Sequence, residues 1–263
     1  TLIEPSEIQF ELTPITPPCT DATNGQIILN NITGGAGNYT YALDGNNGGV
    51  IQNTSTIIDF VESGDHVVTL TDMNGCLATE TTFVPSSNEI EMNLGDDQTI
   101  ELGDSVQLFP IYNFVPAGVI WSANTPCSDC LNQFVSPTYQ TTYTLTMLND
   151  EGCVTTDAIT ILVEKNRHVF IPNVFSPDDN GFNDIFYINA GQDVKEVKNF
   201  RIYNRWGAEI FVQEHFQPND PLMGWDGTFK NKNMNPGVFV YFAEIEFLDG
   251  RVEIYKGDVT LKR

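Results

Sequence analysis

The clearest pattern in the chain is a two-residue alternation of apolar and polar side chains within short runs. In residues 66–71, Val68 and Leu70 alternate with Val67 and Thr69, which is the period of a half-buried β-strand. Similar runs follow at intervals of about 8–12 residues, separated by Asn-Gly, Asp-Gly and proline signals for turns. No stretch has the period of an amphipathic helix. The pattern predicts an all-β protein of tandem immunoglobulin-like β-sandwich modules.

Turn signals divide the predicted strands into four segments. We expect the tail of a preceding repeat in residues 1–11, a β-sandwich repeat in 12–87, an immunoglobulin-like β-sandwich in 88–165 and a third β-sandwich in 166–263. The third sandwich carries the strongest hairpin signal, Asp249-Gly250 between two strand-like runs. This arrangement predicts independent modules joined by short linkers.

A short internal similarity supports the first boundary. Residues 1–10 and residues 82–92 both read as an apolar strand end, a Pro-Ser linker, and a Glu-Ile pair that opens the next strand. Arrays of repeats leave this signature when a piece is cut from them. Two similar turns that arose by chance would give the same pattern, so both interpretations stay open.

In the second sandwich, Trp121 lies in the third predicted strand, where we expect a core residue.

Charge separates the last module from the others. All 12 Lys and Arg residues lie at or after Lys165, whereas 21 of the 35 acidic residues precede it. An acidic surface repels nucleic acid and anionic lipid, so neither is an expected partner. The chain has no run of 18 apolar residues, and we expect no membrane span of its own. The basic residues are concentrated where a partner that recognises particular side chains is expected to bind.

The five cysteines lie in the two upstream modules. Cys19 precedes the first strand of one module and Cys76 opens its last strand, so we expect a Cys19–Cys76 disulfide that stabilises by roughly 4 kcal/mol. Such a bond implies an oxidising, extracytoplasmic compartment. We expect a second disulfide between Cys127 and Cys130, with Cys153 buried and free. Zinc is the alternative for these three, but it prefers four ligands and this module has no histidine.

Enzymatic signatures are missing from the sequence. The three histidines, His66, His168 and His215, are scattered, and none lies in a zinc-binding helix motif or beside a nucleophile motif. There is no phosphate-binding loop and no dinucleotide fingerprint. A pair of catalytic carboxylates is not excluded by counting, but most acids on such a chain are solvated. We therefore expect a protein that is not an enzyme.

One loop has the composition of a cation site. Asp178, Asn180 and Asp184 are spaced around Gly181, and the Phe182 carbonyl is a further oxygen. Oxygen ligands at alternate positions around a glycine suit Ca²⁺, which is the one cofactor that we consider. The loop lacks the distal bidentate glutamate of an EF-hand. The alternative is a turn held by hydrogen bonds from side chains to the backbone.

Two groups in the last module are candidates for partner binding. Arginine and aromatic residues dominate interface hot spots, so Arg201, Tyr203, Arg205 and Trp206 form the first group. The second group belongs to the last predicted strand: Val259, Leu261, Lys262 and Arg263. Val259 and Leu261 alternate with polar residues, so one face can pack while the two terminal basic side chains meet an acidic or carbonyl-rich surface.

Five motifs in the last module, in a fixed order, resemble those of a known family. They are Phe170–Pro177 with the loop to Asn183-Asp184, Phe200–Gly207, Trp225–Gly227, Pro236–Tyr241 and Gly257–Arg263. Together they resemble the gliding-motility-associated C-terminal domain, the type B sorting domain of type IX secretion system substrates. Two positions depart from the family pattern: the loop reads Asp178-Asp179-Asn180-Gly181, and the final strand contains Asp258.

The upstream modules carry a second resemblance. Gly25-Gln26-Ile27, Thr33-Gly34-Gly35, Tyr39-Thr40-Tyr41 and the stretch Thr71–Cys76, together with Cys19, resemble the SprB-type adhesin repeat. Residues 88–165 resemble the immunoglobulin-like domains that often precede the sorting domain.

These resemblances imply the C-terminal part of a cell-surface adhesin used in gliding motility. Its last domain would be exported by the type IX translocon and held at the outer membrane by a PorP/SprF-type protein, so the expected location is extracellular, on the cell surface. The upstream repeats would be free to bind surface polysaccharide. The alternative is the non-catalytic C-terminal region of a secreted polysaccharide-degrading enzyme with glycan-binding modules, because the same sorting domain is attached to enzymes.

Overall fold

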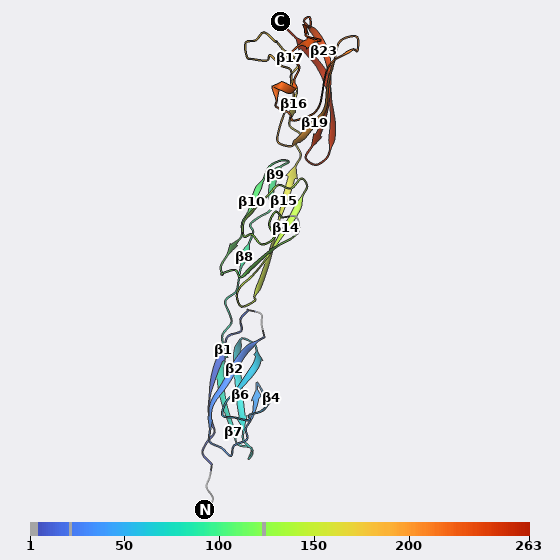
Figure 1. Cartoon of the computed structure of the whole chain (residues 1–263). Helices are drawn as coiled ribbons and strands as arrows, with labels where there is room; N and C mark the ends of the chain where they lie inside the picture. Colours follow the sequence, from blue (N-terminus) through green and yellow to red (C-terminus); the bar gives the residue numbers. More distant parts are fainter. Residues whose placement is uncertain (1–4, 21–22, 123–124) are drawn as a thin grey trace, which may run out of the picture. The chain divides into compact units, whose positions relative to one another are not determined.

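The structure is a computed structural model that describes residues 5–20, 23–122 and 125–263. The described chain consists of β-strands joined by turns, with one short 3-10 helix and no α-helix within the described ranges (Figure 1). The predicted all-β fold is confirmed. The chain divides into two compact units, each described by itself: unit 1 comprises residues 1–93, 112–120 and 146–156, and unit 2 comprises residues 94–111, 121–145 and 157–263.

Unit 1 contains a β-sandwich made of two antiparallel sheets. Their strand orders are β1-β2-β5 and β4-β3-β6-β7, with the bounds β1 Gln9–Ile15, β2 Gly25–Thr33, β3 Thr40–Leu43, β4 Asn46–Val50, β5 Thr56–Val61, β6 Gly64–Thr71 and β7 Leu77–Val84. Alternate residues of β2 and β6 point inward, and Ile27, Leu29, Val68 and Leu70 are fully buried between the sheets. The alternation in the sequence thus corresponds to a half-buried strand at β6, as expected.

Residues 8–11 belong to this sandwich and not to the tail of a preceding repeat. Ile8 and Phe10 are buried in its core, and β1 pairs with β2 so that Glu11 lies opposite Asn30. The predicted segment 1–11 is wrong in this part, because its inward-facing side chains complete the core of the first sandwich. Residues 1–4 of that segment lie outside the described residues.

The middle of the chain forms a sheet with the strand order β12-β14-β15-β9, together with the pairs β10-β13 and β11-β8. The bounds are β8 Met92–Asn93, β9 Gln98–Glu101, β10 Val106–Leu108, β11 Ile111–Tyr112, β12 Gly118–Trp121, β13 Gln133–Val135, β14 Thr141–Leu148 and β15 Val154–Glu164. Trp121 is buried, and its Nε1 donates to the carbonyl of Cys130 at 2.8 Å, as expected for a core tryptophan. Both units take residues from this region, so the predicted boundaries at 88 and 166 are not the boundaries of the units and stay predictions.

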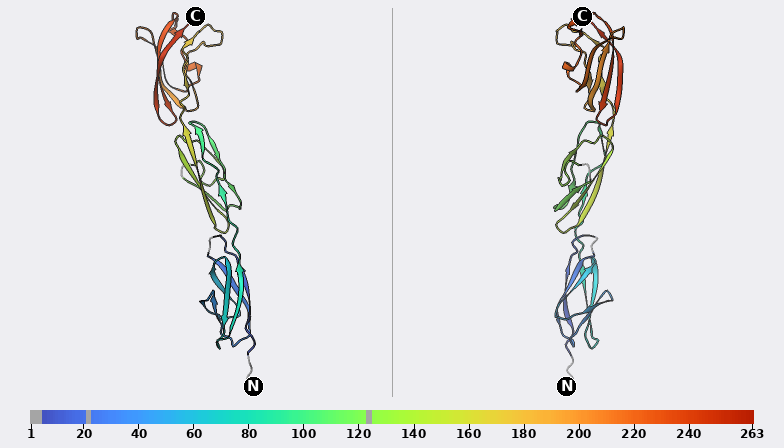
Figure 2. Two further views of the ribbon diagram at one scale, coloured as in Figure 1. Left: turned by 180° about the vertical axis from the view of Figure 1, so that it is seen from behind. Right: turned by 45° about the vertical axis from the view of Figure 1, so that its right-hand side comes forward.

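The last part of unit 2, residues 166–263, is called the C-terminal domain below. Its main sheet has the order β17-β24-β23-β19-β20, and Figure 2 shows this sheet from two further sides. The bounds are β16 Val169–Phe170, β17 Val174–Phe175, β18 Asn189–Ala190, β19 Val194–Tyr203, β20 Glu209–Phe216, η1 Pro221–Met223, β21 Thr228–Phe229, β22 Lys232–Asn233, β23 Gly237–Phe247 and β24 Val252–Leu261. The pairs β16-β18 and β21-β22 are separate small sheets.

An aromatic cluster fills the core of the C-terminal domain. Phe186 is fully buried against Phe175, Phe200 and Tyr241, with ring centroids 5.6–5.8 Å apart, and Trp225 lies 5.2 Å from the Phe175 ring. Such contacts stabilise beyond the area that they bury. The bridge between Phe186 and Trp225 joins two segments outside the main sheet and holds them over its inner face.

The β23–β24 hairpin binds the segment that leads into the domain. Asp249, at its turn, accepts hydrogen bonds from Arg167 at 2.7 and 3.1 Å. It also forms an ion pair with Lys165 at 3.0 Å. The hydroxyl of Tyr139 donates to the Asp249 carbonyl, and Lys165 lies 4.0 Å from the centre of the Tyr139 ring. We call this arrangement the Asp249 clasp. The predicted Asp249-Gly250 hairpin is thus present, and the first two basic residues of the chain serve internal contacts.

The disulfides differ from the predicted set. The structure joins Cys127 to Cys130, as expected, but it joins Cys19 to Cys153, and Cys76 is free and exposed. The expected Cys19–Cys76 bond and the expected free thiol at Cys153 are therefore both wrong. With Cys127 and Cys130 in a disulfide, their thiols do not form a zinc site with the neighbouring carboxylate of Asp129.

Strand direction explains why Cys19 and Cys76 do not meet. Cys19 lies in the β1–β2 loop, and Gly25 at the start of β2 is paired with Val61, from which the chain turns directly into β6. Cys76 follows the far end of β6, an eight-residue strand that spans roughly 26 Å at 3.3 Å per residue. A disulfide requires Cα atoms within about 7 Å. Neighbouring strands thus place these two cysteines at opposite ends of the sandwich.

Candidate docking surface of the C-terminal domain

A tight turn between β19 and β20 presents Trp206 to solvent. The side chain of Asn204 accepts hydrogen bonds from the backbone N–H groups of Trp206 at 2.9 Å and Ala208 at 3.0 Å, and Gly207, with φ +79°, donates to the Asn204 carbonyl. These bonds fix the turn, while Trp206 is 84% exposed. The guanidinium of Arg205 lies 5.6 Å from the centre of its ring. A fixed, exposed tryptophan beside an arginine has the composition of an interface hot spot.

Arg201, which the sequence grouped with these residues, is engaged within the domain. It lies on the outer face of β19 and contacts Glu209 at 2.7 Å, Glu214 at 2.6 Å and Asn199 at 2.8 Å. The hydrogen bond to Glu209 is the main cause that raises the pKa of Arg201. Tyr203, two residues on, is half-buried on the same face. The structure therefore keeps Arg205 and Trp206 together as a candidate contact and assigns Arg201 to an ion-pair network.

Two residues of the last strand that we expected at a partner surface lie in the core instead. Val259 and Leu261 are buried, because β24 lies between β17 and β23 and its inward face meets the aromatic cluster. The alternation was correct, but the prediction that these two side chains contact a partner is wrong. Lys262 and Arg263 are exposed, and Arg263 Nη2 lies 3.3 Å from the carbonyl of Gly227. Only these two terminal residues of the predicted group are accessible to a partner.

The Asp-Asn loop is closed by its own hydrogen bonds. The carboxylate of Asp184 accepts from the backbone N–H groups of Asp178 and Asp179 at 2.9 Å and of Gly181 at 2.8 Å. Asn180 Oδ1 accepts from the Phe182 amide at 2.8 Å. The oxygens that would bind a cation are thus directed at amides, and among the described residues the carboxylates of this loop do not form a metal-type cluster. The calcium site, including the Phe182 carbonyl, stays a prediction that rests on residue types, and this geometry fits it poorly.

Calcium removal will distinguish the two interpretations of the loop. We expect the melting temperature of the full chain to be the same in excess Ca²⁺ and in EGTA, because the loop amides already have carboxylate acceptors. We expect Asp184→Ala to lower the free energy of unfolding by about 1–3 kcal/mol in both conditions, since it removes hydrogen bonds to a charged acceptor. A stabilisation by Ca²⁺ that is lost in Asp184→Ala would instead establish the metal site.

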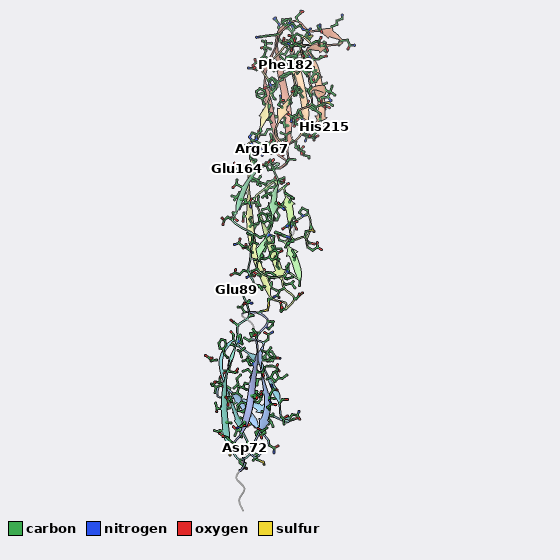
Figure 3. The ribbon with its side chains drawn as sticks, turned by 90° about the vertical axis from the view of Figure 1, so that its left-hand side faces the viewer. Asp72, Glu89, Glu164, Arg167, Phe182 and His215 are labelled. Carbon is green, nitrogen blue, oxygen red and sulfur yellow. A yellow bond between two sulfur atoms is a disulfide. The ribbon has the colours of Figure 1, made fainter. Side chains whose placement is uncertain are left out.

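An open groove adjoins this loop. It has a volume of about 620 Å³ and is lined by Phe170, Val174, Tyr187 and Pro221 on the apolar side and by Asn183 and Asp184 on the polar side. Phe170 is 65% exposed although it opens the first motif of the domain. Figure 3 shows Phe182, also exposed, on the same domain. The exposure of Phe170 was not expected from the sequence, because an apolar residue in a strand-like run is usually part of the core.

The histidines do not assemble a catalytic site within the described chain. His66 pairs with Asp44 at 2.8 Å, His168 lies 3.9 Å from Glu101, and His215 lies 3.3 Å from Glu196. These pairs are carboxylate contacts on separate strands and loops, and none includes a hydroxyl or thiol nucleophile. Nor does the described chain contain a helix with the length and apolar character that crossing a membrane requires.

Comparison with known proteins finds a family similarity in the C-terminal domain. Residues 169–261 match the family CHU_C, described as the type IX secretion signal domain. No curated protein matches the chain. Among solved structures, the chain is similar to the Dpr2 Ig1-Ig2 complex with DIP-Theta (12% identity, 97% of this chain and 99% of that chain, TM-score 0.34). It is also similar to a 1.5-MDa bacterial ice-binding adhesin (13% identity, 98% and 99%, TM-score 0.32) and to a tetra-tandem repeat of a large adhesion protein (10% identity, 98% and 75%, TM-score 0.32). Residues 169–261 are thus similar to a type IX secretion signal domain, which supports the sorting domain expected from the sequence.

Proposed function

We propose that this chain is the C-terminal part of a cell-surface adhesin used in gliding motility, with its last domain acting as both export signal and anchor. The match of residues 169–261 to the type IX secretion signal domain is the observation that carries the proposal. A secretion signal of this kind marks the protein for export. In the proposal, the same folded domain then binds an outer-membrane PorP/SprF-type protein, which retains the adhesin on the surface.

The upstream sandwiches suit a stalk outside the cell. Before Lys165 the sequence has no basic residue, which favours solubility and disfavours contact with anionic surfaces. The Cys19–Cys153 and Cys127–Cys130 disulfides require an oxidising environment. Small β-sandwiches cross-linked in this way resist unfolding, which an adhesin under load needs. Binding of surface polysaccharide by these modules is part of the proposal.

The proposed contact with the membrane partner is the turn that carries Arg205 and Trp206, together with the terminal residues Lys262 and Arg263. Trp206 offers apolar area on a backbone that needs no further ordering, because hydrogen bonds to Asn204 already fix its turn. Arg205, Lys262 and Arg263 are basic residues that do not belong to the ion-pair networks of the sheet. They would meet an acidic or carbonyl-rich surface.

Surface display tests the proposal with the intact chain. Residues 1–263 are placed behind a general export leader and a folded reporter, in a bacterium that has a type IX system. We expect the reporter on the cell surface with the full chain, and not with a chain that ends at Glu164. A strain without the translocon should lose the surface reporter of the full chain. A strain without the PorP/SprF-type protein should also lose it, with the reporter either released into the medium or kept inside the cell. Equal display of the full and shortened chains would overturn the sorting function.

A further inference from the structure

Four hairpins in the described part of the chain have the same turn. Each joins two consecutive long strands: β6 to β7, β14 to β15, β19 to β20, and β23 to β24. In each, the first residue of a five-residue turn donates its N–H to the carbonyl of the fifth, and the glycine at the fourth position donates back to the first, at distances of 2.9–3.1 Å. The turns run from Asp72 to Cys76, from Asn149 to Cys153, from Asn204 to Ala208 and from Phe247 to Arg251.

Two of these hairpins bind a segment that precedes their own strands in the chain. The turn at Cys153 is joined by a disulfide to Cys19, which lies in the β1–β2 loop. The turn at Asp249 forms the Asp249 clasp with Lys165 and Arg167, just before β16. The chemistry differs, covalent in one and ionic in the other, but in both hairpins a residue of the five-residue turn makes the contact.

The β6–β7 hairpin has a cysteine, Cys76, at the same turn position as Cys153, but this cysteine forms no disulfide within the described residues. Cys76 and Cys153 both follow the turn glycine directly, and both donate their N–H to the side chain of the first turn residue at 2.8 Å. Asp72, which accepts three backbone N–H groups, fixes this turn, and these hydrogen bonds lower its pKa, with that from Ala36 the largest cause. The thiol of Cys76 is exposed and is the free cysteine of the described residues.

The surroundings of the two cysteine hairpins also correspond. The Cys153 hairpin shares a cavity of about 690 Å³ with residues 87–90, the linker that brings the chain to β8. The Cys76 hairpin is hydrogen-bonded to the Gly34–Gly37 loop through Met73 and Gly37, and Gly35 in that loop donates to the carbonyl of Ser6, just before β1. Both linkers end in Glu-Ile. Asp72 and Glu89, labelled in Figure 3, lie at opposite ends of the first sandwich.

We propose that Cys76 forms a disulfide with a cysteine in the loop between the first two strands of a further β-sandwich, placed N-terminal to the first sandwich as that sandwich is placed before β8. The partner cysteine would thus correspond to Cys19. The Cys19–Cys153 disulfide is the observation from which we infer this partner. It is formed by the same kind of turn, with a cysteine at the same position and a similar linker beside it. Successive modules would be linked covalently, each by the hairpin of its last two strands.

The redox chemistry of this bond is ordinary. Two thiols lose two protons and two electrons, one S–S bond forms, and a disulfide oxidant, such as an oxidised thiol-disulfide oxidoreductase or glutathione disulfide, is reduced to two thiols. The extracytoplasmic compartment that the other disulfides require supplies such an oxidant. An exposed thiol that persisted there unpaired would be open to oxidation or to unwanted pairing.

A tandem chain tests the proposal. A copy of residues 5–88 with Cys76→Ser is placed before residues 7–263, so that Glu7 and Ile8 follow the copy as Glu89 and Ile90 follow the first sandwich. This chain has six cysteines, and we expect no free thiol after air oxidation and denaturation. Two free thiols, with Cys19–Cys153 and Cys127–Cys130 intact, would overturn the proposal. In the matched control, Cys76→Ser in the second copy as well, the Cys19 of the added copy should remain as one free thiol.

Peptide mapping separates the remaining outcomes. Under non-reducing conditions the tandem chain should yield a peptide containing Cys76 linked to one containing Cys19. A covalent dimer joined through Cys76 on a non-reducing gel would contradict the proposal and indicate pairing with a second copy. If the tandem chain does not fold, the natural protein is taken from its cells with thiols blocked. Cys76 linked to a cysteine outside residues 1–263 supports the proposal, and alkylated Cys76 contradicts it.

Discussion

Replacing Asp249 with alanine should lower the free energy of unfolding of unit 2 by about 3–5 kcal/mol, because it removes one partner of a buried ion pair. The side chain of Asp249 is 5% exposed and that of Arg167 is 13% exposed, so water replaces little of the lost interaction. In the variant, Arg167 would remain packed against the Phe247 ring, 4.4 Å from its centre, without a counter-charge. The loss of the buried carboxylate therefore destabilises the folded state through the unpaired arginine as well as through the hairpin.

Asp258→Ala is the matched control for this prediction. Asp258 is an exposed residue of β24, the strand that follows the turn at Asp249. Its replacement should change stability by less than about 0.5 kcal/mol. Both variants of the full chain would be unfolded in urea and followed by tryptophan fluorescence. Equal midpoints for the two variants would show that the Asp249 clasp contributes no stability.

The effect of Asp249 should also depend on pH. Hydrogen bonds from Arg167, and then from Lys165, hold the pKa of Asp249 well below its ordinary value. A group whose pKa is lowered on folding contributes stability above its unfolded pKa, about 3.9 for aspartate, and loses it as the pH falls toward the folded pKa. The difference in stability between the natural chain and Asp249→Ala should therefore be constant from pH 7 to about pH 5 and shrink below about pH 4.

The hairpin at Asp249 could be predicted, but the clasp could not. Asp-Gly between two alternating runs is a local signal, since the turn needs a positive φ at Gly250. The contact with Arg167 joins residues 82 positions apart, and a hairpin signal carries no information on what lies beside the turn. The predicted pairing of Cys19 with Cys76 was wrong for a related reason. The predicted bond required the starts of the first and last strands of the module to meet, but β2 and β7 lie in different sheets and begin at opposite ends of the sandwich.

The candidate surface shows the same limit. Alternation in the last strand correctly predicted that Val259 and Leu261 share a face, and the period of two cannot say whether that face meets the core or a partner. Trp206 and Trp225 both belong to motifs by which the C-terminal domain resembles a sorting domain, yet one is 84% exposed and the other 1%. Trp225 is buried because it belongs to the aromatic cluster, which segments distant in the sequence assemble, whereas Trp206 lies outside that cluster.

The two tryptophans should therefore separate folding from docking. Trp225→Ala should lower the free energy of unfolding by about 3–5 kcal/mol, because Trp225 is packed between Phe175 and Phe239 and its Nε1 donates to the Thr228 carbonyl at 2.8 Å. Trp206→Ala should change stability by less than about 0.5 kcal/mol, because no core contact is lost. Urea unfolding of the full chain measures both.

Surface display should detect a loss in Trp206→Ala that its stability does not show. If Trp206 is the hot spot of the proposed docking surface, its loss costs roughly 2 kcal/mol, which weakens binding to the membrane partner about 30-fold and reduces display while the chain stays folded. Phe134→Ala is the matched control, since Phe134 is an aromatic residue of β13 that is 62% exposed outside the C-terminal domain. Its display should equal that of the natural chain. Undiminished display by folded Trp206→Ala would remove this turn from the contact, and the terminal pair Lys262 and Arg263 would be tested next by the same comparison.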